Sequence, residues 1–306
     1  MPLIPFLSLI RYRNLLMIIL TQVLIKYMLL EPFAPATFLG PFDFSLLVLS
    51  MVSLAAAGNI INDLNDIVAD RVNKPGRNPV GTRISERAAF YCFLGLNLLG
   101  VGIGFYLSNL VGRPSFTALF ILPSAFLSLY ATQIKSTVLV GNLVISVMVA
   151  MIVVIVGIFD LLPVITPQNK SSQGVIFSIL IDYAAFAFLI NFLREVVKDQ
   201  EDINGDHKAG YRTLPLVLGR QRTNALLFFA ALLPILGVVF YIYRYLHENE
   251  IAVIYVLLVV LAPLLYFLLK IWNTSTRAEY KHLSLVLKMV LVAGLFSIGL
   301  YRFILI

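Results

Sequence analysis

The chain has 306 residues, of which 60% are hydrophobic and only 13% are charged, with a net charge of +7. A soluble domain of this size carries about twice that fraction of charge, so the composition excludes an ordinary soluble protein. The single cysteine, Cys92, excludes a disulfide framework and a thiolate metal site.

Apolar runs recur along the whole chain, and each is long enough to cross about 30 Å of hydrocarbon. They are continuous rather than alternating, so we expect an all-α membrane protein. The N-terminal segment MPLIPFLSLIRYRN has no small-residue cleavage site after its apolar stretch, so the first helix is expected to be retained. The nine expected spans are residues 14–30, 43–62, 88–111, 115–134, 138–159, 174–193, 223–243, 251–270 and 283–305.

Nine crossings place the two termini on opposite sides of the membrane. Eighteen of the 23 Lys and Arg residues then lie on the side of the N-terminus, and five lie on the other side. The positive-inside rule makes the first side cytoplasmic. This orientation accounts for the positive net charge without a nucleic acid partner. A second interpretation, that some of these cations also bind an anionic substrate, stays open.

The second span ends in an acidic stretch, GNIINDLNDIVADRVNKPGRNP, at residues 58–79. Offsets of three and seven residues put Asp63, Asp66 and Asp70 on one stripe of a helix, with amides on or beside it. Like charges on one stripe repel, and the cost is greater next to hydrocarbon. A solvated helix face is the ordinary interpretation of a single stripe of this kind.

A second acidic stretch, REVVKDQEDINGDHKAGYRTLP, follows the sixth span at residues 194–215. Its aspartates at 199, 202 and 206 repeat the D-x2-D-x3-D spacing, and in both stretches a proline follows nine residues after the last aspartate. Four crossings separate the stretches and return the chain to the same side, so the two can face one another. Two matched copies in a chain with only 16 acids favour a shared site over two solvated faces.

Two facing acidic stripes need a cation between them. Carboxylate and amide oxygens suit Mg2+, which is commonly bound through a few carboxylates together with substrate phosphates. Basic residues beside the stripes are available for the remaining phosphate oxygens. An apolar interior next to such a site fits a polyprenyl diphosphate. We therefore expect prenyl transfer, in which Mg2+ stabilises the departing diphosphate and a water-poor pocket protects the allylic carbocation.

Three groups of sequence segments carry a family resemblance. INDLNDIVADRVNKPGRNPVGTRIS resembles the NDxxDxxxD signature of the UbiA superfamily of intramembrane prenyltransferases, and KDQEDINGD resembles its second Asp-rich motif. YATQIKSTVLVGN is similar to the family's segment between its fourth and fifth helices. RYRN resembles its N-terminal RPxN, with Tyr12 in place of proline. The resemblance implies nine transmembrane helices around a central cavity, with a cytoplasmic cap that carries both Asp-rich motifs.

Together with the residues beside the motifs, the resemblance implies a candidate site in three parts. The expected Mg2+ ligands are Asn62, Asp63, Asp66, Asp70, Asp199, Asp202 and Asp206. The expected diphosphate-binding residues are Lys74, Arg77, Arg83, Lys135, Lys198 and Arg212. The expected lining of the prenyl and acceptor cavity is Arg11, Asn14, Asn59, Tyr130 and Asn142. A snorkelling lysine and an interfacial aromatic stay open as alternatives for Lys135 and Tyr130.

The acceptor is suggested by REVVKDQEDINGDHKAGYRTLPLVLG, which is most similar to the digeranylgeranylglyceryl phosphate synthase-like group of the family. This similarity implies transfer of a geranylgeranyl group to geranylgeranylglyceryl phosphate. The alternative is an aromatic acceptor of quinone biosynthesis: 4-hydroxybenzoate, dihydroxynaphthoate or homogentisate. A phosphate-bearing acceptor needs extra cations in the cavity, and Arg11, Arg13 and Lys135 are the candidates.

Two other classes of protein share some of these features. A secondary transporter would also carry acids in its spans, but these acids cluster at one face rather than at mid-depth. A CDP-alcohol phosphotransferase also uses membrane-face aspartates, but its D-G-x2-A-R signature is missing from this sequence. Within the spans, Lys26 is expected to snorkel to the opposite face. Asp182 is expected either to be functional or to bond a neighbouring helix.

One transmembrane domain is expected over residues 1–306, with pseudo-repeated halves at about 1–137 and 138–306. The expected location is an integral multi-pass protein, in the inner membrane if the source is bacterial. The N-terminus and the cap are expected to be cytoplasmic, and the C-terminus to lie on the opposite side. The expected partners are a polyprenyl diphosphate, a small lipid or aromatic acceptor and membrane lipid, with no nucleic acid and no obligate protein partner.

Overall fold

The computed structural model describes residues 3–73, 75–76, 78–133 and 137–301. Within these ranges the regular elements are helices, apart from an isolated bridge between Val80 and Ile84. The described chain has nine helices long and apolar enough to cross a membrane, which confirms the all-α class and the nine expected spans. They are Tyr12–Phe33, Pro41–Asn65, Glu86–Leu110, Pro114–Thr132, Val140–Val164, Lys170–Lys208, Arg220–Leu246, Glu250–Ile271 and Arg277–Leu300.

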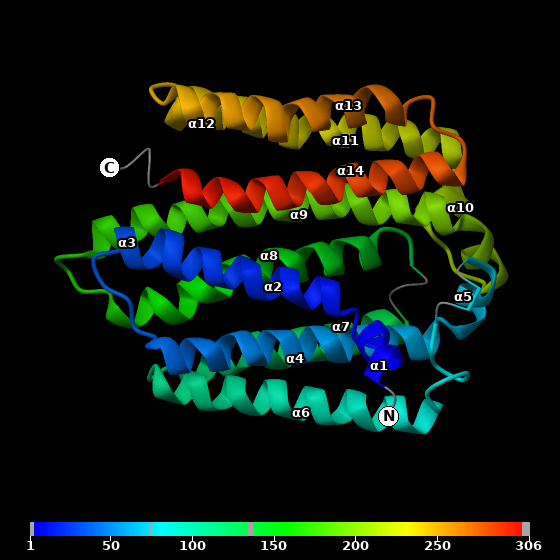
Figure 1. Ribbon diagram of the computed structural model, residues 1–306, viewed down its shortest axis with the longest axis horizontal. Helices are drawn as coiled ribbons and strands as arrows, with labels where there is room; N and C mark the ends of the chain where they lie inside the picture. The colour runs from blue at the N-terminus through cyan, green and yellow to red at the C-terminus, as the bar shows by residue number, and fades with distance from the viewer. Residues whose placement is uncertain (1–2, 74, 77, 134–136, 302–306) are drawn as a thin grey trace.

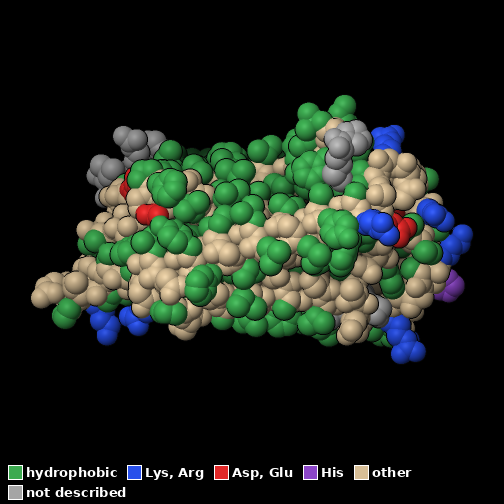
Figure 2. Space-filling model, turned by 90° about the horizontal axis from the view of Figure 1, so that it is seen from below, with side chains coloured by type: hydrophobic (Ala, Val, Ile, Leu, Met, Phe, Trp, Pro, Cys, Tyr) green, Lys and Arg blue, Asp and Glu red, His purple; other side chains and the backbone are tan. Residues whose placement is uncertain are grey.

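The helices run side by side along the long axis of the bundle (Figure 1). Those that position the candidate site are α1 (Leu3–Leu9), α2 (Tyr12–Leu24), α4 (Pro41–Asn65), α5 (Ile67–Asn73), α7 (Ala118–Thr132), α8 (Val140–Asp160), α9 (Lys170–Lys208), α10 (Leu214–Leu218) and α14 (Arg277–Phe296). Figure 1 shows α5 and α10 at one end of the bundle, while α14 runs from that end to the opposite one. In Figure 2, hydrophobic side chains cover the middle of the molecule and most Lys and Arg lie at its ends. This distribution is typical of a membrane-spanning bundle.

Local sequence sets the helix boundaries near the site. Pro41 begins α4, at the position where its missing N–H costs nothing because no helical partner exists there. Thr276 and Glu279 form a capping box at the start of α14. Gly210, with φ 74°, turns the chain after α9, in a backbone region that side chains other than glycine rarely adopt. The turn lets the chain fold back toward the end of α9.

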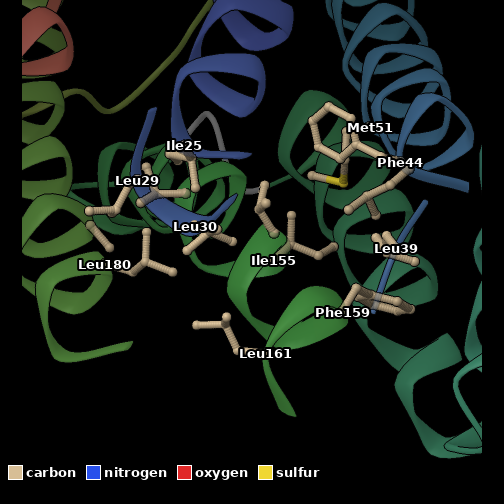
Figure 3. Close-up of a cluster of buried hydrophobic side chains, with 14 of the residues drawn as sticks. Ile25, Leu29, Leu30, Leu39, Phe44, Met51, Ile155, Phe159, Leu161 and Leu180 are labelled. Carbon is tan, nitrogen blue, oxygen red and sulfur yellow. The ribbon is translucent and has the colours of Figure 1, made fainter. Parts of the chain in front are cut away.

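The helix α9 is held by hydrophobic clusters on both of its halves. Figure 3 shows the first cluster, where Ile25 and Leu29 lie with Leu180 of α9. Further along α9, Ile190 and Leu193 belong to a second cluster, formed with the helices that follow. Burying a side chain of this size stabilises the fold by about 1.5–3 kcal/mol. Because α9 is packed against α8 and α14 along its length, the acidic stretch at its end is carried on a fixed support.

The prediction that Lys26 snorkels to the membrane face is wrong. Its side chain is fully buried, and its Nζ donates to Asp160 Oδ2 at 2.8 Å and to the main-chain oxygen of Leu39 at 2.9 Å. Asp160 Oδ1 in turn accepts the backbone N–H groups of Phe38 and Leu39. A carboxylate 134 residues away in the chain neutralises the ammonium inside the bundle. The pair fixes the segment before α4 onto α8, so the lysine has no reason to reach water.

Candidate active site

The first acidic stretch spans the end of α4 and all of α5. The helix α4 ends at Asn65, and Asp66 lies between the two helices, so the prediction of one uninterrupted helix is wrong. The helical bonding pattern continues through the break, because Asp66 N donates to Asn62 O at 2.9 Å and Asp70 N to Asp66 O at 2.8 Å. The backbone therefore stays hydrogen-bonded across the break, which keeps the motif acids near one another.

Arg11 joins the N-terminal turn to this stretch. It lies between α1 and α2, and its Nη2 is 2.6 Å from Asp63 Oδ1. Burial by itself lowers the pKa of the Arg11 guanidinium, but the attraction and hydrogen bond of Asp63 outweigh it. Asp66 and Asp70 add to this effect, so the pKa of Arg11 lies above its ordinary value. All three motif carboxylates thus act on a single guanidinium.

Neutral donors orient the other carboxylates of the stretch. Asn62 Nδ2 donates to Asp66 Oδ2 at 2.7 Å. Asn78 Nδ2 donates both to Asp70 Oδ2 at 3.0 Å and to the main-chain oxygen of Asp63 at 2.8 Å. Amide donors hold a carboxylate in place without cancelling its charge. The arrangement therefore preserves negative charge on oriented oxygens, which are the ligands that hard cations prefer.

The second acidic stretch lies on the last turns of α9. This helix has 39 residues and is about 58 Å long, nearly twice the thickness of the hydrocarbon, so its end extends beyond the membrane core. The aspartates at 199, 202 and 206 therefore share one continuous helix, as predicted. Asn142, at the start of α8, donates to Asp199 Oδ2 at 2.8 Å. Lys198 Nζ lies 3.0 Å from Glu195 Oε1, one turn away.

The two stretches meet through Tyr211, in the turn after α9. Its hydroxyl donates to Asp66 Oδ1 at 3.1 Å. Burial raises the pKa of the Tyr211 phenol, and the charges of Asp66, Asp206 and Asp70 raise it further. The phenol consequently stays protonated and remains a hydrogen-bond donor. The charges of acids from both stretches therefore act on this one side chain.

A second junction ties α5 to α9. Asn73 Nδ2 donates to the main-chain oxygen of Asp202 at 2.9 Å, and Gly205 N donates to Asn73 Oδ1 at 2.9 Å. A Cβ atom at Gly205 would lie 2.2 Å from Asn73 Nδ2, so only glycine permits this approach. Arg277 of α14 donates to the main-chain oxygen of Asn73 and lies 3.8 Å from Asp202 Oδ1. The prediction that the two stretches face one another is confirmed.

The expected cavity residues fall around this junction. Tyr130, half-buried on α7, lies close enough to Glu195, Asp199 and Asp66 for their charges to act on its hydroxyl. Asn59 donates to the main-chain oxygen of Ile10 at 3.0 Å and so holds the turn before α2 against α4. Its role is thus to support the wall of the site. The side chain of Asn14 is exposed in the first turn of α2.

Most of the expected diphosphate-binding residues lie either on exposed segments or outside the described residues. Arg83 and Arg212 are exposed on the segments that follow the two stretches. Lys74, Arg77 and Lys135 lie outside the described residues. A pocket is lined by residues from α4, α5, α7, the end of α9 and the turn after it, among them Asn65, Ala131 and Tyr211.

Four residues of the junction were missed by the sequence reasoning: Asn73, Asn78, Tyr211 and Arg277. The two asparagines carried a signal, because they flank the Pro-Gly turn inside the acidic stretch and amides orient carboxylates. Tyr211 and Arg277 carried none, since their contacts cross 145 and 204 residues of sequence.

The oxygen ligands at the junction are of the type that Mg2+ prefers. Among the described residues, no three His, Cys, Asp or Glu side chains are grouped so as to hold a metal ion by themselves. Mg2+ seldom uses such a cage, because it keeps waters and binds through one or two carboxylates together with substrate phosphates. Asp63, Asp66 and Asp199 offer oriented carboxylate oxygens of this kind. The residues therefore fit a Mg2+ ion that is held jointly with a diphosphate.

Comparison with known proteins identifies the family. The model of the UbiA prenyltransferase family matches residues 23–295. A digeranylgeranylglyceryl phosphate synthase of Methanococcoides burtonii is 31% identical over 286 residues, which cover 91% of this chain and 91% of that protein. The synthase of Methanothermobacter thermautotrophicus is 33% identical over 225 residues, covering 72% of this chain and 69% of that protein.

Solved structures share the fold. A structure described as digeranylgeranylglyceryl phosphate synthase in membranes superposes with a TM-score of 0.67 at 21% identity, covering 96% of this chain and 98% of that one. A UbiA homologue from Archaeoglobus fulgidus, bound to GPP and Mg2+, superposes with a TM-score of 0.59 at 16% identity, covering 96% and 99%. The chain belongs to the UbiA prenyltransferase family.

Proposed function

We propose that this member of the UbiA prenyltransferase family transfers a geranylgeranyl group from its diphosphate to the free glyceryl hydroxyl of geranylgeranylglyceryl phosphate. The observation that carries the proposal is the junction of two acidic stretches, through Tyr211 and Asn73, at one end of an apolar bundle. The names of the curated relatives support the acceptor. The Mg2+ and GPP bound by the Archaeoglobus fulgidus homologue support the donor and the metal.

In this proposal, the motif acids bind the diphosphate through Mg2+. The ligands are Asn62, Asp63, Asp66 and Asp70 from the first stretch and Asp199, Asp202 and Asp206 from the second. When bound, Mg2+ supplies Lewis-acid stabilisation of the negative charge on the diphosphate oxygens. Basic residues bind further phosphate oxygens: Lys74, Arg77, Arg83, Lys135, Lys198 and Arg212.

The chemistry needs a leaving group, a protected cation and a nucleophile. The bond between the prenyl C1 and the diphosphate oxygen breaks, and its electron pair leaves with the diphosphate. The resulting allylic cation is protected from water by the apolar interior. The acceptor hydroxyl oxygen then bonds to C1, giving an ether, and its proton passes to solvent. Tyr130, close enough to Asp66 and Asp199 for their charges to act on its hydroxyl, would line the cavity near the prenyl C1.

The orientation in the membrane is part of the same proposal. The excess of Lys and Arg on one side supports a cytoplasmic N-terminus and a cytoplasmic cap that carries the Asp-rich motifs, with the C-terminus on the other side. The chain would act as a single multi-pass domain over residues 1–306, with pseudo-repeated halves at about 1–137 and 138–306.

A competition between acceptors tests the proposal. Purified protein in mixed micelles receives Mg2+, labelled geranylgeranyl diphosphate and equal amounts of geranylgeranylglyceryl phosphate, 4-hydroxybenzoate and dihydroxynaphthoate. We expect the label in the diether lipid phosphate, and no product when Mg2+ is chelated. Asp63→Asn should form much less product than wild type. Asp43→Asn, at the opposite end of α4, is its matched control. Label in a prenylated aromatic compound alone would refute the glyceryl phosphate acceptor. Product formation that is independent of Mg2+ would refute the role of the metal.

A further inference from the structure

Glu195 is the innermost acid of the second acidic stretch. It lies on α9 one turn before Asp199, about 6 Å nearer the apolar spans and on the same stripe of the helix. One turn further in, Asn191 donates to Ser146 of α8 at 3.3 Å, while Asp199 accepts from Asn142 of α8 at 2.8 Å. Glu195 therefore lies on the face of α9 that meets α8, between the acidic junction and the apolar interior.

The Glu195 carboxylate is held in place and can still accept a hydrogen bond. Lys198 Nζ lies 3.0 Å from its Oε1 and 3.1 Å from its Oε2, and Arg194 Nη1 donates to Oε1 at 3.2 Å. These bonds use three of the about four lone-pair sites of an ionised carboxylate, so Oε2 can accept one more donor. The side chain is 13% exposed, so a small polar group can reach it. The two cations offset the cost of burying its charge.

The position of Glu195 sets it apart from the other proton acceptors of the chain. The three histidines are exposed in loops or at helix ends: His207, His247 and His282. The motif aspartates lie further out and are assigned to Mg2+ in the proposed function. The charge of Glu195 acts on the hydroxyl of Tyr130, the residue expected near the prenyl C1. Glu195 is thus a carboxylate on the inner side of the diphosphate site that the proposed function leaves without a role.

The proposed reaction releases a proton that needs an acceptor. When the acceptor hydroxyl oxygen bonds to C1, that oxygen becomes positively charged, and its O–H bond must break before the ether is complete. A pocket that protects an allylic cation excludes water, so the proton reaches solvent only through a group at the edge of the pocket. A carboxylate suffices as the base, because an oxonium ion is far more acidic than a carboxylic acid.

We propose that Glu195 is the general base of the transfer, and that its Oε2 accepts the proton of the acceptor hydroxyl as the new C–O bond forms. An oxygen lone pair makes the bond to C1, and the electron pair of the broken O–H bond stays on the ether oxygen. The carboxyl group then passes its proton to solvent. The inference rests on the proposed function and adds to it the residue that activates the nucleophile. Glu195 therefore serves the acceptor step and not the departure of the diphosphate.

A comparison of two nucleophiles tests the inference. Wild type and Glu195→Gln are assayed with geranylgeranylglyceryl phosphate and with its analogue that carries a thiol in place of the reacting hydroxyl. We expect turnover with the hydroxyl acceptor to fall about 100- to 1,000-fold in Glu195→Gln. Turnover with the thiol acceptor should stay near the wild-type value, because a thiol is partly ionised at neutral pH and needs no base. Glu250→Gln, exposed at the start of α12 (Glu250–Tyr255), is the control and should behave as wild type.

Two further measurements separate catalysis from support of Lys198. Exchange of an oxygen isotope between the bridging and terminal positions of bound geranylgeranyl diphosphate reports departure of the diphosphate, and it should continue in Glu195→Gln. Glu195→Asp keeps the carboxylate on a shorter side chain, so it should show the same selective loss to a smaller degree. A purely structural role would lower the rates with both acceptors and the isotope exchange together.

The outcomes distinguish this inference from the function on which it rests. Equal losses with the hydroxyl and the thiol, loss of isotope exchange, or no loss with the hydroxyl would each overturn Glu195 as the general base and leave the proposed function in place. A wild type that makes no product with geranylgeranylglyceryl phosphate, but prenylates an aromatic acceptor, would instead refute the proposed function.

Discussion

Buried charge occurs at both ends of the bundle, and the two ends treat it differently. At the end near the segment before α4, Lys26 and Asp160 are fully buried and neutralise each other, and backbone groups take their remaining hydrogen bonds. At the other end, amides and a phenol donate hydrogen bonds to Asp66 and Asp199, while Asp63 pairs with the part-exposed Arg11. The first arrangement is complete within the protein and holds the fold. The second gathers carboxylates from two distant stretches of the chain, which is typical of a functional site.

The largest effect is expected when the ion pair between Lys26 and Asp160 is broken. Lys26→Met leaves Asp160 buried without its cation, so we expect a loss of about 3–5 kcal/mol in the free energy of unfolding. Thermal unfolding of the purified protein in detergent measures this loss. The double variant Lys26→Met, Asp160→Leu removes both charges and should recover part of the stability. If the double variant is no more stable than the single one, the pair is not the cause.

At the acidic junction, a substitution is expected to lower turnover strongly and stability little. Asp63→Asn removes an oriented anionic oxygen, so turnover should fall about 100- to 1,000-fold through loss of electrostatic stabilisation of the leaving diphosphate. Its unfolding temperature should fall only slightly, because the loss of the part-exposed ion pair with Arg11 is offset by the removal of one repulsive charge from the motif. Asp43→Asn on the same helix should change neither quantity. Unfolding of Asp63→Asn at a much lower temperature would make the acidic stretch a structural element instead.

An intermediate effect is expected at the contact between α5 and α9. Gly205→Ala introduces a Cβ into the space of the Asn73 amide, which must break its two hydrogen bonds to α9. We expect a cost of about 1–3 kcal/mol and a raised KM for geranylgeranyl diphosphate, because the two stretches separate. Gly174→Ala, on the same helix with open space around it, is the control and should be neutral or slightly stabilising. Equal behaviour of the two variants would contradict the close approach.

The smallest effect is expected at Tyr211. Tyr211→Phe removes one hydrogen bond to Asp66 and should lower turnover about 3- to 10-fold. Since the pKa of this phenol is raised above its ordinary value, the donor keeps its proton up to at least about pH 10. The wild-type rate should therefore show no loss from this group between pH 7 and pH 10. A loss in that range that disappears in Tyr211→Phe would show that the phenol ionises earlier.

The sequence was sufficient for what depends on composition, spacing and the parity of crossings. Hydropathy predicted the nine spans, and the repeated spacing predicted that the acids at 63–70 and 199–206 meet. The break at Asp66 was not predicted, because local periodicity does not indicate where a helix is interrupted. The partner of Lys26 was not predicted, because the contact spans 134 residues and no pattern near the lysine indicates it.

The central claim is that the two acidic stretches hold one Mg2+-bound diphosphate, and a double-mutant cycle tests it most directly. The dissociation constant of geranylgeranyl diphosphate at fixed Mg2+ is measured for wild type, Asp63→Asn, Asp199→Asn and the double variant. Because both carboxylates serve the same bound group, we predict that the double variant binds far more tightly than the product of the two single losses would give, with a coupling of at least about 1 kcal/mol. Losses that simply multiply, within about 0.5 kcal/mol, would mean two independent sites and would contradict the account.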